Sequence, residues 1–505
     1  MAEFTRRQFL ANMGAGAIFL SMGSKQTFAQ NSKMLSPLPM IDASAGSEAS
    51  VALNLQQGFH DFGNGHKAAT YGINGNYLGP VVRVKKSQSI QFDVTNNVDE
   101  TAAIHWHGMH IPGNVDGGPH QAIAVGKAWN PVLEIKNRAS MNWYHAHTHG
   151  RTGYQVYTGL AGVLLVEDDD SIAADLPKTH GVDDFVVVLQ DKLVGSDGSV
   201  IYSPKNVNNA IAVNGILAPT LQNVAPGLVR LRILNGSNGA FIKLSLADNA
   251  PLHVIASDGG FLSATVSRDY IIMSPGERYE VLVDTSKGDV SLQTLRFDDE
   301  EITAQPGRVD TTLTAAPEIA LTLTADSELK GFTGSLPGTL ASVAAADPSQ
   351  AVRIREFVLS EDVAPRFAAM AHRLGNHCAD HDHAAMGING RPMDMAFINE
   401  TVPINEYEIW RVRSEDGAHP FHVHGCSYRI LKQMGQTPPD YASGWKDMMY
   451  AAPGSVSELL VRFDHQADAK TPYMYHCHIL KHEDCGMMGQ FTVGKEPAYS
   501  APLAI

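Results

Sequence analysis

The sequence predicts an all-β protein built from three β-sandwich domains. Its 505 residues are enough for about three domains. A hydrophobic content of 44%, with 45 glycines and 26 prolines, is typical of a chain rich in strands and turns. Three stretches also share one plan, in which an Asn-Gly turn and a short link precede alternating apolar residues: 72–97, 212–238 and 387–415. Such alternation indicates strands with one buried face, and its long repeat indicates duplicated sandwiches.

The chain begins with the pattern of an export signal. Residues 5–10 (TRRQFL) form a twin-arginine motif, and the apolar stretch that follows to about Met22 is too short for a membrane span. The small residues at 27–29 offer a cleavage site. We therefore expect a twin-arginine signal peptide at 1–29 and a periplasmic or otherwise exported mature protein. We expect no stable membrane insertion after cleavage, because no later apolar run reaches the length of a span.

Changes in composition divide the mature chain further. The acidic run at 168–170 and the Ala/Thr/Gly-rich stretch at 313–352 read as boundaries between domains. The expected parts are domain 1 at 30–168, domain 2 at 169–325, a linker at 326–352 and domain 3 at 353–505.

The formal charge of −15, without any basic stretch interleaved with aromatic residues, excludes nucleic acid as an expected partner.

Ten histidines in four short clusters are the most informative feature of the chain. The clusters are HWH (105–107), HAH (145–147), HPFHVH (419–424) and HCH (476–478), the last running on to His482 and Met487. Residues i and i+2 of a strand point to the same face, so each His-x-His pair directs two imidazoles to one place. Four such pairs give eight imidazoles, which is too many for a single zinc ion and fits a cluster of three metals.

A second metal site is predicted by the cysteine within the last cluster. Cys477 lies between His476 and His478, so its sulfur should face away from the three-metal cluster. Together with two histidines and a weak axial thioether, this thiolate makes the ligand set of a blue-copper electron-transfer site: His419, Cys477, His482 and Met487. Six other histidines are interpreted as ordinary polar residues: His60, His66, His110, His120, His149 and His465.

These motifs resemble those of the multicopper oxidases, the laccase-like blue oxidases. HPFHVHG and HCHILKHEDCGMM match the family patterns closely, and WYHAHTHGRTGYQVYTGLAGVLLVEDD and GWKD (444–447) are most similar to bacterial exported cuprous oxidases and bacterial laccases. The resemblance covers about residues 50 to 495 and includes all four motifs. It implies three cupredoxin-like Greek-key domains, in which the first and third carry the copper ligands and the second carries none.

The resemblance also implies a role for each ligand around four copper ions. Type 1 copper would take His419, Cys477, His482 and Met487, and type 2 copper would take His105 and His422. The type 3 pair would take His107, His145, His147, His424, His476 and His478. Asp116 and Glu483 are the implied proton donors, with plain solvated or capping carboxylates as the alternative. Asp447 is expected to orient a blue-site histidine from outside the ligand shell.

The implied activity is a copper-dependent oxidase of laccase type, which takes electrons from phenols or aromatic amines and reduces dioxygen to water. Cuprous oxidation for copper detoxification is the alternative. Soft ligands suited to Cu(I) occur in a segment that could equally be a polar loop: Met370, His372, His377, Cys378, His381, His383 and Met386. EDGA (415–418), without methionines, and Lys481, where those relatives usually have Glu, both depart from the cuprous oxidases.

Two questions stay open in the sequence. A non-catalytic exported scaffold of the same fold, such as the cell-division relatives that have lost their copper ligands, is the alternative from another class, and copper sequestration is a third. Retention of all ten histidines, Cys477 and Met487 favours the oxidase. Cys426 and Cys485 could form a disulfide or could be buried inert thiols.

Overall fold

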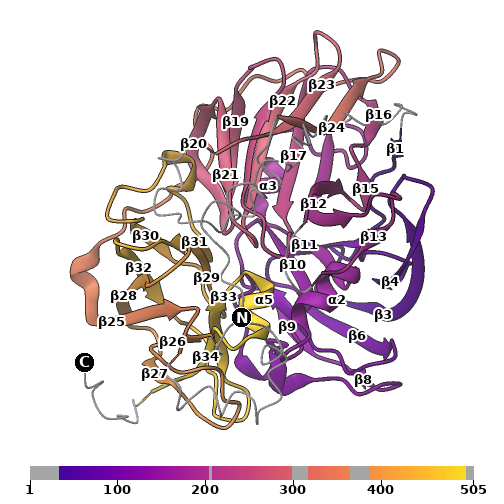
Figure 1. The fold of residues 1–505 in the computed structure, drawn as a ribbon. Coiled ribbons are helices and arrows are strands. Elements are labelled where there is room, and N and C mark those ends of the chain that lie inside the picture. The colour runs from indigo at the N-terminus through magenta and orange to yellow at the C-terminus, as the bar shows by residue number, and fades with distance from the viewer. Residues whose placement is uncertain (1–32, 204–207, 298–316, 364–385, 496–505) are drawn as a thin grey trace, which may run out of the picture. The chain divides into compact units, whose positions relative to one another are not determined.

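The computed structural model describes residues 33–203, 208–297, 317–363 and 386–495 (Figure 1). Within these ranges the strands form six sheets, and the helices are few and short. The all-β prediction is confirmed. The predicted signal peptide, 1–29, lies outside the described residues. None of the helices in the described part of the chain has the length and apolar character that a membrane crossing would need.

The first sheet pair is formed by the chain from Met40 to Glu167. One sheet has the order β2 (Met40–Asp42), β5 (Val81–Lys85), β11 (Ala161–Glu167), β10 (Ser140–Ala146) and β7 (Ile104–His107). The other has the order β4 (Lys67–Ile73), β3 (Glu48–Asp61), β6 (Ser89–Asn97) and β8 (Ala128–Trp129), with β9 (Val132–Glu134) also on β6. A continuous apolar core, including Phe92, Trp106 and Trp143, fills this part of the molecule.

The middle sheet pair holds the second core, which includes Phe185, Leu231 and Val281. Its larger sheet has the order β15 (Ile216–Leu217), β14 (Ala210–Val213), β12 (Asp184–Val194), β17 (Leu228–Asn235), β22 (Arg278–Asp284), β19 (Leu252–Ser257) and β20 (Gly260–Arg268), with β13 (Val200–Ile201) on β12. Its smaller sheet has the order β1 (Met34–Leu35), β16 (Thr220–Val224), β24 (Glu318–Ala325), β23 (Val290–Leu295), β18 (Ile242–Leu246) and β21 (Tyr270–Met273).

The third sheet pair packs around Trp410, Phe421 and Tyr475. One sheet has the order β26 (Gly387–Ile388), β25 (Ala351–Ser360), β28 (Tyr407–Ser414), β32 (Ser457–Arg462) and β30 (Arg429–Lys432). The other has the order β27 (Glu400–Pro403), β34 (Met488–Gly494), β33 (Tyr473–Cys477), β29 (His419–Val423) and β31 (Met448–Ala451). β29 and β33 are neighbours in this sheet, and together they carry three of the predicted metal-binding histidines: His419, His422 and His476.

The three Asn-Gly turns of the repeats have the same geometry. Asn74, Asn214 and Asn389 have φ angles of 57°, 48° and 54°, in the left-handed region that asparagine tolerates better than most residues. In each turn the asparagine amide exchanges hydrogen bonds with the backbone of a strand: β3, β12 or β25. The repeats seen in the sequence therefore occupy equivalent positions in the three sheet pairs.

Short helices and connections join the sheet pairs. α5 (Leu480–Asp484) lies against α2 (Thr152–Thr158), because the Asp484 carboxylate accepts hydrogen bonds from the backbone nitrogens of Thr152 and Gly153. α3 (Asp169–Ala173) follows β11. β1 pairs with β16 of the middle sheet pair. Between β24 and β25 the described chain has a single 3-10 turn, η4 (Pro348–Gln350), and the predicted domain boundaries stay predictions.

Candidate metal centres

Two pairs of neighbouring strands bring eight histidines together. β7 and β10 place His105 opposite His145, and β29 and β33 place His422 opposite His476. Imidazole rings from the two sheets stack on one another. The ring centroids of His105 and His424 are 3.7 Å apart, and those of His107 and His422 are also 3.7 Å apart. Strand alternation thus directs all four His-x-His pairs to one buried place.

The ligand atoms of these histidines fall into three overlapping groups. In each group the candidate atoms all lie within 4.8 Å of one another. The groups are His107, His145 and His478; His147, His424 and His476; and His105, His107 and His422. The first two groups contain the six histidines that the resemblance assigned to the type 3 pair. The third contains both histidines assigned to type 2 copper.

The chemistry of this cluster fits metal ions. Buried polar atoms normally have hydrogen-bond partners, yet several ring nitrogens here have none among the described residues: His105 Nε2, His107 Nδ1, His145 Nε2, His422 Nε2, His478 Nδ1 and His478 Nε2. Burial, reinforced by the neighbouring histidines, holds the pKa values of His107, His145 and His422 well below the usual range. Burial also lowers the pKa of His476 to about 3. Neutral imidazoles are the form that binds metals, so a metal would complete this donor set.

The second predicted site gathers on the opposite face of β33. Cys477 Sγ lies 3.5 Å from His419 Nδ1 and 3.7 Å from His482 Nδ1, and these two nitrogens are 3.2 Å apart. Met487 shares the third core with Cys477 and accepts the Cys477 backbone N–H at 3.0 Å. Burial raises the pKa of the Cys477 thiol, so a metal ion would have to displace its proton.

The blue-site ligands differ in exposure. The sequence left open whether His419 or His482 is the ligand that meets solvent. His419 is fully buried, whereas His482, on the short helix α5, is half-buried. His482 is therefore the ligand through which an external electron donor could approach.

Two predicted proton donors contact the histidine cluster. Asp116 is buried, with Oδ2 2.7 Å from His424 Nδ1 and 3.5 Å from His105 Nδ1. Its other oxygen, Oδ1, has no partner among the described residues. A carboxylate in this position both orients a ligand ring and has one oxygen free for a proton.

Glu483 lies on the other side of the same cluster. Its carboxylate accepts a hydrogen bond from Thr152 Oγ1 at 2.7 Å and lies 3.2 Å from His476 Nδ1 and 3.4 Å from His147 Nδ1. Burial and the neighbouring Asp484 raise its pKa well above the usual range. A carboxyl group whose pKa is raised by burial is suited to act as an acid.

The predicted role of Asp447 at the blue site is wrong. Asp447 Oδ1 lies 3.1 Å from Nε2 of His107, and its carbonyl lies 2.9 Å from Nδ1 of His422, so it positions the histidine cluster. The reason is the strand register, because β31 pairs His422 with Met448 and puts His419 opposite Ala451. Asp447 therefore sits at the cluster end of β31.

Two residues near the centres were missed by sequence reasoning. The buried side chain of Arg278, on β22, contacts the Asp447 carboxylate from the middle sheet pair, and no motif around it signals that role. Asp416, within EDGA, lies with Oδ1 3.3 Å from His419 Nε2. Although burial opposes the shift, the hydrogen bond with His419 lowers the pKa of Asp416. An acidic residue three positions before a ligand histidine was the available signal.

The predicted Cu(I) segment is described only at its end. Met370, His372, His377, Cys378, His381 and His383 lie outside the described residues. Met386, at the end of this segment, is buried within the third core.

The cysteines resolve one open alternative. Cys426 is a free buried thiol, so the Cys426–Cys485 disulfide does not form. Cys485 is disulfide-bonded, so it is not an inert thiol either. Cys477 is the other free thiol among the described residues, as a metal ligand must be.

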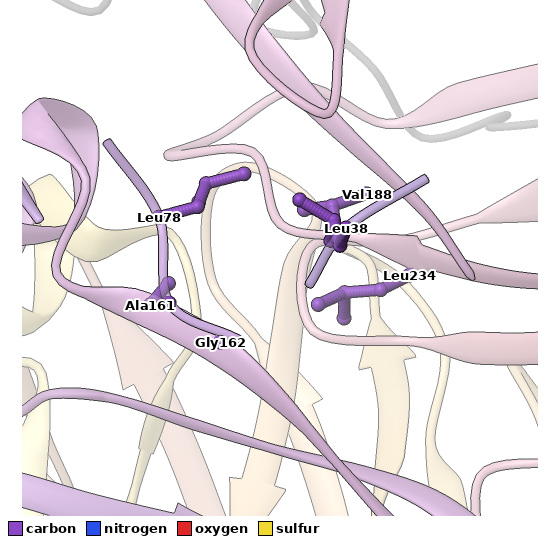
Figure 2. A pocket seen from close by; sticks show the side chains of 7 residues that line it. Leu38, Leu78, Ala161, Gly162, Val188 and Leu234 are labelled. Atoms are coloured by element: carbon purple, nitrogen blue, oxygen red, sulfur yellow. The ribbon is translucent and has the colours of Figure 1, made fainter. Parts of the chain in front are cut away.

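A small pocket away from the metal centres carries no chemistry. Figure 2 shows its apolar side chains facing one another, and it is lined by Leu38, Leu78, Gly79, Ala161, Gly162, Val188 and Leu234. β11 of the first sheet pair and β12 and β17 of the middle pair contribute four of these residues. Without any titratable or hydrogen-bonding side chain, this pocket is a packing feature.

Comparisons with known proteins agree with this geometry. Two family models, both described as multicopper oxidase, match residues 54–171 and 363–497. The cell division protein FtsP of Escherichia coli (strain K12) is 33% identical over 501 residues, covering 98% of this chain and 100% of that protein.

Solved structures are similar over nearly the same length. The laccase-like multi-copper oxidase CueO from the lignin-degrading bacterium Ochrobactrum sp. is 38% identical, with a TM-score of 0.80 over 91% of this chain and 100% of that one. The multicopper oxidase McoA of the hyperthermophile Aquifex aeolicus is 26% identical, with a TM-score of 0.76 over 92% of this chain and 99% of that one.

Proposed function

Because this chain belongs to the multicopper oxidase family and has its cupredoxin fold, we propose that it is an active copper oxidase of laccase type. It would couple one-electron oxidation of phenolic or aromatic reductants to the four-electron reduction of dioxygen to water. The main observation behind this proposal is the arrangement around β33. On one face of this strand Cys477 lies with two histidines, and on the other face lies the cluster of eight histidines. We infer four copper ions, one type 1, one type 2 and a type 3 pair, and export by the twin-arginine route.

Bound copper would supply one-electron redox chemistry at the Cys477 site and dioxygen reduction at the histidine cluster. The chain's own residues do the remaining work. His482 offers a half-buried edge to the reductant, while the buried cluster excludes bulk water. Asp447 and Asp116 hold the rings of His107 and His424 in fixed orientations.

Proton supply rests on two carboxyl groups that touch different histidines. Glu483, whose pKa is raised, places its carboxyl group within 3.4 Å of His147 and His476. Asp116 lies 2.7 Å from His424, and its other oxygen has no hydrogen-bond partner in the part of the chain that the structure describes. Because the two groups sit on different parts of the cluster, each could deliver protons independently.

An aromatic reductant is favoured by the side chains beside His419. Phe241 and Tyr450 pack edge to face at 5.7 Å in a small apolar cluster with Ala418 and Ala452, and Phe297 and Met434 are only half-buried against it. Ala418, a member of this cluster, directly precedes His419 in the chain. An apolar, partly aromatic surface near the blue-site ligands suits a phenol or aromatic amine.

Two other functions have observations in their favour. Similarity to the protein named CueO, and the His/Met segment at 370–386, favour cuprous oxidation. Identity of 33% with cell division protein FtsP over nearly the whole chain favours a scaffold. Retention of every predicted copper ligand weighs against a purely structural role.

Oxygen uptake by the copper-loaded mature protein tests the proposal. A methoxyphenol and Cu(I) are compared across concentration series, with Cys477→Ser as the matched inactive control. Higher catalytic efficiency with the phenol supports the laccase reading, and higher efficiency with Cu(I) supports copper detoxification. Absence of oxygen uptake with both, in a protein that binds copper, would leave the scaffold or sequestration as the function.

A further inference from the structure

One small core cluster consists of methionines alone. Met393, Met474 and Met488 are buried against one another, with exposed fractions of 1% or less, and Met395 packs against them half-buried. The large cores of the described residues are built differently. In the first core, for example, Met109 and Met141 are scattered among many branched and aromatic side chains. Leucine would fill such space with better-defined rotamers, so an all-thioether cluster needs a chemical reason.

This methionine cluster adjoins the histidine cluster. Met488 lies directly opposite His476 in the β33–β34 ladder, and Met474 lies two residues before His476, so both emerge on the face of His476. The Met474 carbonyl accepts the backbone N–H of His424 at 3.0 Å. Gly118 separates Met474 from Asp116, because a Cβ added there would lie 3.8 Å from Met474 Cε and 3.9 Å from Asp116 Oδ2.

The segment that carries Met393 and Met395 is fixed in place. The Gln490 side-chain amide donates to the carbonyls of Asp394, Met395 and Phe397 at 3.3, 3.1 and 2.9 Å. Its oxygen pairs with His120 Nε2 at 2.8 Å, which ties this segment to the first sheet pair. Met393 N also donates to the Gly486 carbonyl at 2.9 Å. The four methionines therefore extend from half-buried Met395 to the edge of the histidine cluster.

We propose that Met393, Met474 and Met488 form a Cu(I)-binding site, with Met395 as its outer ligand, through which copper reaches the histidine cluster. Thioethers are soft, uncharged ligands that select Cu(I) over Cu(II) or zinc. Imidazole nitrogens bind copper more strongly than thioether sulfurs do. An ion that arrives as Cu(I) would therefore exchange its thioether ligands for the imidazoles of His476 and His424. No electron is transferred in this step. This proposal rests on one part of the proposed function, namely that the histidine cluster binds copper. It does not require that the protein oxidise any reductant.

The test uses the full-length mature protein and Ag(I), a soft monovalent ion that mimics Cu(I) without donating electrons. The holoprotein is titrated with Ag(I) by calorimetry, and the triple variant Met393→Leu/Met474→Leu/Met488→Leu is compared with Met109→Leu/Met141→Leu/Met273→Leu. Both sets replace buried methionines by leucine of similar volume. A second readout is the rate at which copper-free protein takes up Cu(I) without oxygen, followed by copper analysis of protein separated from free copper at successive times.

We expect the wild type and the control triple to bind about one Ag(I) at this site, and the cluster triple to lose it. Copper uptake by the cluster triple should slow by about tenfold or more, with the final copper content unchanged. Wild-type Ag(I) binding by the cluster triple would overturn the site, and lost binding with normal uptake would overturn its role in delivery. If the triple variant fails to fold, the single variant Met395→Leu carries the same two readouts. Because Ag(I) binding needs no oxygen consumption, an inactive oxidase would leave this result standing.

Discussion

The guanidinium of Arg278 grips both carboxylate oxygens of Asp447, with Nη1–Oδ1 and Nη2–Oδ2 distances of 2.5 and 2.6 Å. Both side chains are fully buried. Arg278 begins β22 of the middle sheet pair, and Asp447 directly precedes β31 of the third sheet pair. Asp447 in turn contacts His107. The middle sheet pair, which supplies no candidate metal ligand, therefore helps to position the histidine cluster through one charge pair.

Replacing Arg278→Met should destabilise the protein and loosen the cluster. Asp447 and Asp258 would remain as buried carboxylates without their guanidinium partner, a loss of about 3–5 kcal/mol in the free energy of unfolding. Urea unfolding measures this loss, and copper analysis should find less metal in the histidine cluster while the blue absorption remains. Arg268→Met is the matched control, because its exposed pair with Asp440 should contribute about 1 kcal/mol or less. Equal effects of the two variants would contradict the argument.

Cys477→Ser should abolish the blue absorption and electron uptake but leave the fold and the histidine cluster intact. The thiolate is the soft ligand between His419 and His482, and serine cannot replace it. Visible absorption, copper content and circular dichroism together check this expectation. Cys426→Ser, which changes the other free buried thiol, should stay blue. A blue Cys477→Ser protein would refute the assignment.

Met487→Leu should raise the reduction potential of the blue site. Met487 is buried beside Cys477, and removing a weak axial donor destabilises the oxidised copper more than the reduced copper. Redox titration of the blue absorption measures the shift, and Met449→Leu in the same core is the control. An unchanged or lower potential would argue against the axial role.

Glu483→Gln should slow oxygen reduction without slowing reduction of the blue site. The amide keeps the hydrogen bond with Thr152 but cannot release a proton beside His147 and His476. A positioned proton donor typically contributes about 10²–10⁴-fold to rate. Stopped-flow reduction without oxygen is compared with steady-state oxygen uptake, and Glu100→Gln, on the part-exposed pair with Arg151, is the control. Parallel loss of both rates would mean that Glu483 maintains the structure instead.

Lys192→Met should change how stability depends on pH. Lys192 is fully buried, its Nζ donating to the Tyr157 carbonyl at 2.8 Å, and burial lowers its pKa to about 7. Between that value and the unfolded pKa of about 10.4, the unfolded chain binds more protons, so wild-type stability gains up to about 1.4 kcal/mol per pH unit as pH rises.

The methionine variant lacks this titration, so its stability relative to wild type should fall as pH rises from about 7 to about 10. Urea unfolding at several pH values measures the difference, with the exposed Lys127→Met as the control. A difference that does not vary with pH would mean that Lys192 has no depressed pKa in the folded protein.

Local rules made the metal centres predictable. A period of two residues was enough to expect that His476 and His478 face one way and Cys477 the other. Arg278 was out of reach of such rules, because it meets Asp447 across 169 residues through the packing of separate sheets. The role of Asp447 was misjudged for the same reason, since the register of β31 against β29 decides which histidine it faces. The methionine cluster likewise depends on β33 and β34 being neighbours.

The three consecutive residues His476, Cys477 and His478 connect the two candidate metal sites covalently. Their separation is set by bond lengths and angles within one peptide segment, which hardly stretch, and only weakly by how tightly neighbouring sheets are packed. Thermal motion that loosens the packing between sheets would thus leave the distance for internal electron transfer between the two sites almost constant. Inserting a single residue into this segment would have the opposite effect, because it would turn the sulfur and the imidazoles to the wrong compartments at once.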